Sequence, residues 1–238
     1  MASDLLFYAN VQHDISRYEE SLSYLKEFIS QKSNLNKKER AIFGLIYKDA
    51  IDQTRNTLRI LSDDLGNKGA PEQMAVVQRY FDKSLNELNI QCNEALSIIN
   101  DTLLPSSDDL VAKAFYYKMA GDLYRYMYEF SQTKESSYLQ SAETEYNKAI
   151  EISSANLPFS HPVRLGSILN YSVFLYEHCH NREKAIELVK TALSDVEKDT
   201  TTLSKGTQLE TIDVINVMQK NLEYWDMSLQ SSDEGDDE

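Results

Sequence analysis

Apolar side chains recur at three- and four-residue intervals along almost the whole chain, which is the period of an amphipathic α-helix. No segment shows the strict alternation of a half-buried β-strand. Asn36, followed three residues later by Glu39, resembles a capping box at a helix start. The segment from Gly66 to Pro71 is typical of a break between two helices.

Two proline-containing turns predict further helix starts. Pro105 and Pro158 each precede serines, so we expect hydroxyl N-caps there. Weaker breaks near positions 15, 133, 181 and 201 bring the expected number of helices to about nine. Because the connections are short, successive helices should run antiparallel. The pattern therefore predicts an all-α domain over residues 1–228 and an acidic flexible tail over residues 229–238.

The composition favours an intracellular protein. The 238 residues are 42% hydrophobic and 26% charged, which is enough for one large core or two small ones. The N-terminus does not resemble a signal peptide, and no run approaches the roughly 20 apolar residues that span a bilayer. Cys92 and Cys179 are too few for a disulfide framework. We expect a cytoplasmic location, with the nucleus left open as a second one.

The net charge of −14 narrows the range of partners. The last ten residues contribute −5, so the remaining chain is acidic in its own right. Such a field repels nucleic acid and anionic membranes, and neither is expected as a partner. Any phosphate that this protein recognises must meet a local cluster of basic side chains.

Enzyme chemistry finds little support in the sequence. The glycines never approach the spacing of a phosphate-binding loop. His178, Cys179 and His180 are consecutive, and neighbours on a helix point about 100° apart, so they do not converge on one metal ion. We expect no enzyme activity, no cofactor and no metal.

A short repeated sequence leaves one alternative fold open. The sequence Lys-Ala-Ile-Glu occurs at 148–151 and again at 184–187, a spacing close to that of tetratricopeptide repeats. A tetratricopeptide-like scaffold that binds unphosphorylated peptides is therefore the runner-up interpretation.

Basic residues form stripes at helical spacing. Lys48, Arg55 and Arg59 lie seven and eleven residues apart, which places them on one helical face. Lys118 and Arg125 repeat the seven-residue relation farther along. Guanidinium groups match phosphate oxygens in a bidentate manner, so arginines from two such stripes could surround a phosphate. Two mixed stripes follow, formed by Asn170, Val173 and Glu177 and by Val214, Val217, Asn221 and Tyr224.

The segments that carry these stripes resemble the 14-3-3 family. The matching motifs are Tyr47-Lys48 with Arg55 and Arg59, the segment 115–126, the segment 161–177 and the segment 221–225, and the resemblance extends in order from residue 4 to residue 225. It implies nine antiparallel helices that form a cup with a concave ligand groove, and two cups joined as a dimer. It also implies a non-enzymatic adaptor that binds phosphoserine or phosphothreonine segments of client proteins through an arginine cluster.

The resemblance assigns roles residue by residue. The phosphate would be bound by Lys48, Arg55, Arg125 and Tyr126, with Arg59, Asp122 and Glu129 supporting them. The peptide groove would be formed by Lys118, Leu169, Asn170, Val173, Glu177, Asp213, Val214, Val217, Asn221, Leu222 and Trp225. The dimer interface would contain Arg17, Glu20, Tyr80, Lys83 and Glu87. A homodimer is expected, and a heterodimer is left open.

Departures from the family pattern concern the last helix. Asp213 stands where the family usually has an apolar residue, and Tyr224 stands where it has a leucine, so the peptide preference should differ. Thr57 occupies the interface position where many relatives carry a regulatory serine. We also expect that the phosphate-binding side chains contribute little to the stability of the fold, as polar groups brought together by a ligand.

Overall fold

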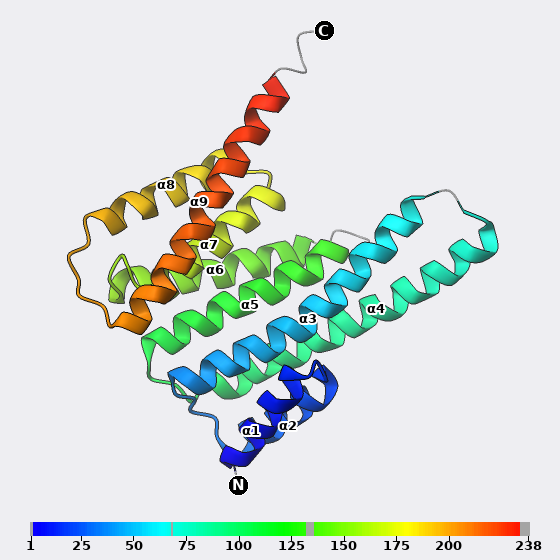
Figure 1. Ribbon diagram of the computed structural model, residues 1–238, viewed down its shortest axis with the longest axis horizontal. Coiled ribbons are helices and arrows are strands. Elements are labelled where there is room, and N and C mark those ends of the chain that lie inside the picture. Colours follow the sequence, from blue (N-terminus) through cyan, green and yellow to red (C-terminus); the bar gives the residue numbers. More distant parts are fainter. Residues whose placement is uncertain (1, 68, 132–135, 234–238) are drawn as a thin grey trace. The chain divides into compact units, whose positions relative to one another are not determined.

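The computed structural model describes residues 2–67, 69–131 and 136–233, with only the backbone of Ser136 and of residues 228–233. Over these residues the regular elements are nine α-helices and one π-helical turn, η1, with no strand (Figure 1). This confirms the all-α prediction. The elements are α1 (Ala2–Asp14), α2 (Tyr18–Gln31), α3 (Lys37–Gly66), α4 (Pro71–Ser97), η1 (Ile98–Leu103), α5 (Leu110–Phe130), α6 (Ser136–Asn156), α7 (Pro162–Glu177), α8 (Arg182–Glu197) and α9 (Lys205–Asp233).

Local sequence signals account for several helix ends. The side chain of Asn36 accepts hydrogen bonds from the backbone N–H groups of Lys38 and Glu39. The Glu39 carboxylate in turn accepts one from the backbone N–H of Asn36, which completes the predicted capping box of α3. Helix α3 ends at Gly66, and α4 begins with Pro71 in its first position, as predicted.

The expected hydroxyl caps were wrong. Helix α5 begins after Asp109, whose Oδ1 accepts a hydrogen bond from the backbone N–H two residues on, at 2.9 Å. Helix α7 begins after His161, whose Nδ1 accepts the equivalent bond at 3.2 Å. Both side chains stand directly before the first helical residue, where any short acceptor satisfies an otherwise unpaired N–H, and the serines lie too early in the chain to do so.

The last helix runs into the predicted tail. Helix α9 continues to Asp233, whereas the sequence analysis begins the tail at Leu229. Between Gly206 and Gly235 neither glycine nor proline interrupts the helix, which explains its length. Residues 234–238 of the tail lie outside the described residues.

The chain divides into two compact units, and unit 1 consists of Met1–Asp108 and Leu123–Leu139. In this unit α3 and α4 lie side by side in opposite directions, and α1 packs against α2 (Figure 1). The largest buried side chains include Leu25, Phe28, Phe43, Ile46, Tyr47, Ile51, Leu58, Leu88 and Ile99. Burial of these apolar groups supplies most of the stability of the unit.

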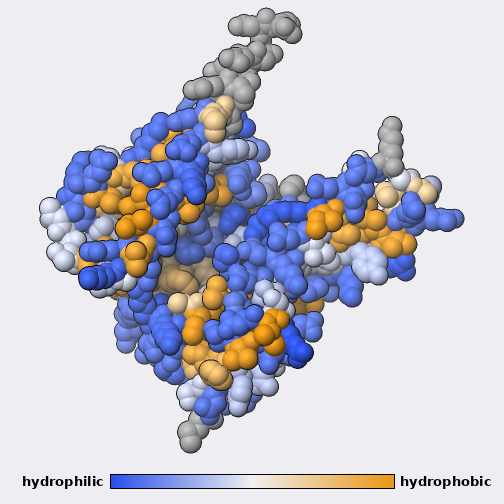
Figure 2. Space-filling model, in the orientation of Figure 1, coloured by the Kyte–Doolittle hydropathy of each residue, from blue (hydrophilic) through white to orange (hydrophobic). Residues whose placement is uncertain are grey.

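One face of unit 1 keeps apolar side chains in contact with solvent. These side chains are Phe7, Tyr8 and Val11 of α1 and Ile15 directly after it, and Phe7 is 64% exposed. Figure 2 shows hydrophobic surface over α1 and α2. A contiguous apolar surface of this kind is characteristic of a protein interaction site.

Unit 2 consists of Asp109–Asp122 and Gln140–Glu238, and in it α7 packs against both α8 and α9. Tyr146 of α6 lies at the centre of an aromatic cluster, with ring centroids 5.8 Å from Tyr171 and 5.5 Å from Phe174. On α5, Gly121 permits this arrangement, because a Cβ atom there would lie 2.8 Å from the Tyr146 ring. The absence of a side chain at Gly121 thus fixes how closely α6 approaches the first part of α5.

Candidate ligand-binding site

Arg55 of α3 lies at the centre of a charged cluster in unit 1. Its Nε and Nη2 donate hydrogen bonds to Oε2 of Glu129 at 3.0 and 2.6 Å, and its Nη1 donates to Oδ1 of Asp52 at 2.6 Å. The guanidinium carbon lies 3.8 Å from the centre of the Tyr126 ring. Only 9% of the Arg55 side chain is exposed. Two carboxylates therefore hold the guanidinium at its edges, while an aromatic ring covers one of its faces.

Glu129 of α5 links Arg55 to a second arginine of α3, Arg59. Its Oε1 accepts hydrogen bonds from Nε and Nη2 of Arg59 at 3.1 and 2.8 Å. Burial acts to raise the pKa of Glu129, but the two arginines outweigh it and the net pKa lies below the ordinary value. The carboxylate is therefore ionised at neutral pH and orients both guanidinium groups.

Lys48 extends the cluster along α3. Its Nζ lies 3.2 Å from Oδ2 of Asp52 and 3.5 Å from Oδ1 of Asp49. Asp49 also pairs with His13 of α1, whose Nε2 lies 2.9 Å from the other carboxylate oxygen. Burial acts to lower the pKa of Lys48, whereas Asp52 and Asp49 raise it, and the net pKa is above the ordinary value. Lys48 is therefore protonated and positively charged at neutral pH, and its side chain is 62% exposed.

Arg125 and Tyr126 contribute from the part of α5 that belongs to unit 1. Both side chains are buried, and the guanidinium carbon of Arg125 lies 4.7 Å from the centre of the Tyr126 ring. The Tyr126 ring thus contacts the guanidinium groups of both Arg55 and Arg125. All four predicted phosphate-binding residues lie in unit 1, together with the supporting residues Arg59 and Glu129.

The sequence analysis missed the two aspartates of this cluster. Asp52 follows Lys48 by four residues and precedes Arg55 by three, which are the spacings at which side chains pair on a helix. The signal was therefore present on the stripe that the basic residues define. Asp49 contacts Lys48 as its immediate neighbour, a relation that helix periodicity does not indicate.

Asp122 organises a second polar network, in unit 2. Its carboxylate accepts hydrogen bonds from Nζ of Lys118 at 3.0 Å, from the Tyr146 hydroxyl at 2.6 Å and from Nδ2 of Asn170 at 2.8 and 2.9 Å. Two predicted groove residues, Lys118 and Asn170, thus meet a predicted supporting residue. Tyr146 was missed, although a buried tyrosine needs a partner for its hydroxyl.

Four predicted groove residues line a hollow of about 360 Å³ within unit 2. The residues around it are Val173, Tyr176, Glu177, His180, Arg182, Asn221, Tyr224 and Trp225. Trp225 is only 3% exposed, because its ring stacks on Tyr176 with centroids 4.6 Å apart and planes 11° apart. Glu177, His180, Arg182 and Tyr224 are exposed, so the accessible part of this hollow combines a carboxylate, an imidazole, a guanidinium group and an aromatic ring.

The other predicted groove residues lie elsewhere on the same helices. On α7, Leu169 is half-buried, and on α9, Val214 and Leu222 are also half-buried. Asp213 and Val217 of α9 are exposed. Asp213 and Val217 are therefore accessible to solvent, and Leu169, Val214 and Leu222 are accessible in part.

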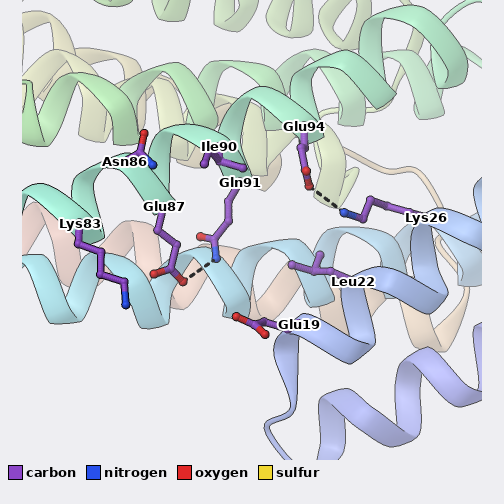
Figure 3. Close-up of a pocket in the computed structure, with 9 residues that line it drawn as sticks. All are labelled: Glu19, Leu22, Lys26, Lys83, Asn86, Glu87, Ile90, Gln91 and Glu94. Atoms are coloured by element: carbon purple, nitrogen blue, oxygen red, sulfur yellow. Dashed lines mark hydrogen bonds and ion pairs between the residues drawn. The ribbon is translucent and has the colours of Figure 1, made fainter.

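The predicted dimer residues lie on the surface of unit 1. Arg17, Glu20, Tyr80, Lys83 and Glu87 are all exposed. Lys83 and Glu87 of α4 border a hollow of about 400 Å³, which Figure 3 shows between side chains of α4 and α2. Among the described residues, Arg17, Glu20 and Lys83 form no ion pair. Their charges are therefore available to another molecule.

Among the described residues, none of the α-helices has the combination of length and apolar composition that a membrane-spanning segment requires. No three His, Cys, Asp or Glu side chains in the same part of the chain are placed to hold a metal ion. Burial raises the pKa of the Cys92 thiol to about 12 and that of Cys179 to about 11, so both cysteines remain protonated at neutral pH.

Comparison with known proteins agrees with this geometry. The family model of the 14-3-3 protein matches residues 8–226. The chain is 31% identical to a 14-3-3 protein of Eimeria tenella, with 96% of this chain and 88% of the relative aligned. It is 32% identical to a 14-3-3-like protein of Fucus vesiculosus (99% and 92% aligned) and 30% identical to a 14-3-3 protein homolog of Neospora caninum (97% and 91%). The chain therefore belongs to the 14-3-3 family, whose members are adaptors and not enzymes.

Proposed function

We propose that this protein binds phosphoserine or phosphothreonine segments of client proteins and regulates those clients in signalling. The observation that carries the proposal is the cluster of Lys48, Arg55, Arg125 and Tyr126 in unit 1. It gathers fixed guanidinium groups and an exposed ammonium group in a protein whose net charge is −14. Because the overall negative charge of the protein does not attract an anionic ligand, such a ligand can be bound only where basic side chains are grouped locally.

The chemistry of the cluster fits a phosphate group. Arg55 and Arg125 are both buried against the ring of Tyr126. Burial acts to lower the pKa of Arg55, but Tyr126 and Glu129 outweigh it and the net pKa lies above the ordinary value; repulsion by Arg125 is a smaller lowering effect. A phosphate dianion relieves that repulsion and offers several acceptor oxygens to guanidinium N–H groups. Each charge-assisted hydrogen bond contributes about 1.5–3 kcal/mol, so the loss of one donor weakens binding roughly tenfold to several hundredfold.

The predicted groove residues bind the peptide around the phosphorylated residue in this proposal, as the family resemblance implies. By resemblance to the family, Asn170 and Asn221 hydrogen-bond the main chain of the ligand. Asp213 is exposed on α9 and favours basic ligand side chains, where an apolar residue would favour apolar ones. Because Tyr224 is 65% exposed and borders the hollow that also contains Glu177, it adds a ring against which such a basic side chain can pack.

The protein acts as a dimer in this proposal, joined through unit 1. The exposed apolar residues of α1 provide the burial that stabilises an interface, and ion pairs contribute only about 0–1 kcal/mol each. Arg17 and Glu20 of one protomer pair with Glu87 and Lys83 of the other. The double change Arg17→Glu and Glu20→Lys should raise the dissociation constant in sedimentation measurements through like-charge repulsion. A wild-type protein that sediments as a monomer at micromolar concentration would refute this part of the proposal.

The tetratricopeptide-like alternative is not favoured. The two Lys-Ala-Ile-Glu segments lie in α6 and α8, and the 14-3-3 match spans residues 8–226, which include both of them. An unphosphorylated ligand would also make no use of the guanidinium and ammonium groups gathered around Arg55. The cytoplasm is the proposed location, where kinases and phosphorylated clients meet.

One screen tests the function. A peptide library should be synthesised in two forms, identical except that the central serine or threonine is phosphorylated in one. We expect measurable binding only for phosphorylated members, with basic side chains enriched near the phosphorylated residue. Equal binding of the two forms would contradict the proposed function and restore the scaffold interpretation.

A further inference from the structure

The carboxylate of Asp52 contacts two of the residues that we propose to bind phosphate. Its Oδ1 accepts a hydrogen bond from Nη1 of Arg55 at 2.6 Å, and its Oδ2 lies 3.2 Å from Nζ of Lys48. Glu129 binds the other two nitrogens of Arg55, so Nη1 is the nitrogen of that guanidinium that Glu129 does not contact. Asp52 thus occupies the side of the cluster that contains the exposed ammonium of Lys48.

We propose that Asp52 is an internal counter-ion that stands in for the ligand phosphate when the site is empty and competes with it during binding. The inference rests on the proposed function, because it assigns a regulatory role within the same site. Asp52 neutralises Lys48 and Arg55 in the free protein, and it lowers the affinity of the site for any anion that needs the same nitrogens.

The geometry makes this competition unavoidable. A phosphate that accepts hydrogen bonds from Arg55 Nη1 and Lys48 Nζ shares these donors with Asp52. Two acceptors on one nitrogen lie within about 5 Å of each other. A carboxylate and a phosphate dianion at that separation repel each other strongly enough, even in a water-like dielectric, to weaken binding about tenfold. The Asp52 side chain is 31% exposed, so it can rotate toward solvent when phosphate enters.

Charge competition can be separated from a purely structural role, because it predicts opposite effects on the free and the bound protein. Asp52→Asn removes the negative charge but keeps the shape and one acceptor oxygen. The free variant should melt roughly 2–4 °C below wild type, since Lys48 and Arg55 each lose one of their two carboxylate partners. The same variant should bind phosphate more tightly, and this gain should shrink as the salt concentration rises.

The probes are three fluorescein-labelled 15-residue peptides that differ only at the centre, which holds phosphoserine, glutamate or serine. Fluorescence anisotropy at low salt should give about tenfold tighter binding of the phosphoserine peptide to Asp52→Asn than to wild type. The gain for the glutamate peptide should be smaller, because its single charge is repelled less by Asp52. Asp52→Glu keeps the charge and should stay within about threefold of wild type.

Asp64→Asn provides the matched control. Asp64 lies on the same helix, exposed, and about 18 Å farther along it, so the variant changes the net charge equally without touching the cluster. It should bind within twofold of wild type. If Asp52→Asn is folded by circular dichroism and binds the phosphoserine peptide no more tightly than wild type, the role of Asp52 is refuted while binding that depends on Arg55 still supports the function. Failure of the phosphoserine peptide to bind either protein would overturn both proposals.

Discussion

Replacement of Arg55 by alanine should destabilise the empty protein, contrary to the expectation from the sequence that the phosphate-binding residues contribute little to the fold. The Arg55 side chain is 9% exposed, makes three hydrogen bonds to carboxylates and covers the ring of Tyr126. Helix periodicity does not reveal the contact with Glu129, which lies 74 residues farther along the chain and has a supporting role only through the family resemblance.

The size of the stability loss depends on which ion pairs remain after Arg55 is replaced. Breaking a buried ion pair costs about 3–5 kcal/mol when the surviving charge is left alone. Here Glu129 keeps Arg59 and Asp52 keeps Lys48, so neither carboxylate is isolated. Both carboxylates are also partly exposed, 19% for Glu129 and 31% for Asp52. We therefore expect Arg55→Ala to lower the free energy of unfolding by about 2–3 kcal/mol, out of the 5–15 kcal/mol typical of a folded protein.

Urea denaturation followed by circular dichroism at neutral pH measures this difference. Arg59→Ala is the internal reference, because Arg59 binds the same carboxylate but is 50% exposed, and its loss should cost only about 0–1 kcal/mol. If Arg55→Ala costs no more than Arg59→Ala, the reasoning from burial is wrong. A loss of 2–3 kcal/mol would still leave the protein folded at 25 °C, so binding by Arg55→Ala can be measured on folded material.

Three further outcomes are expected. Glu129→Gln should lower the free energy of unfolding by about 1–3 kcal/mol at pH 7. Because the folded-state pKa of Glu129 lies below its ordinary value of 4.5, this difference from wild type should shrink as the pH falls below about 4.5. A difference that does not depend on pH would contradict the ionised pair. Gly121→Ala should cost about 2 kcal/mol in a thermal melt, since its Cβ would displace the Tyr146 ring that hydrogen-bonds Asp122, and an unchanged melting temperature would show that the ring moves freely. Asp213→Leu should shift the ranking of a phosphopeptide library from basic toward apolar side chains, and an unchanged ranking would remove Asp213 from the account of specificity.

Helix periodicity was the most informative signal in the sequence. It grouped Lys48, Arg55 and Arg59 on one face of α3, because residues seven and eleven apart return to nearly the same angle. Gly66 and Pro71, which interrupt helices locally, indicated the break between α3 and α4. Helix faces and helix breaks could therefore be predicted from short stretches of sequence, whereas the capping residues of α5 and α7 could not.

Contacts between distant segments could not be predicted in this way. The hydrogen bond from Tyr146 to Asp122 joins residues 24 apart, and the aromatic ring fits only because Gly121 has no side chain. Asp52 shows a different limit: its position on the basic stripe was visible, but helix spacing alone does not distinguish a solvated acid from a counter-ion in a binding site. The deciding quantity is the burial of Arg55, which depends on tertiary packing.

Titration of one phosphoserine peptide and its unphosphorylated form against wild type and Lys48→Glu tests the central claim most directly. Lys48 is 62% exposed, so its reversal should leave the fold intact while placing a carboxylate beside the phosphate. Lys38→Glu is the matched control, with the same charge change at an exposed position of α3 about 15 Å away. We predict that wild type and Lys38→Glu bind the phosphorylated form at least about 100-fold more tightly than the unphosphorylated one, and that Lys48→Glu loses this preference. Equal affinity of wild type for both forms, or wild-type binding by folded Lys48→Glu, would contradict the account.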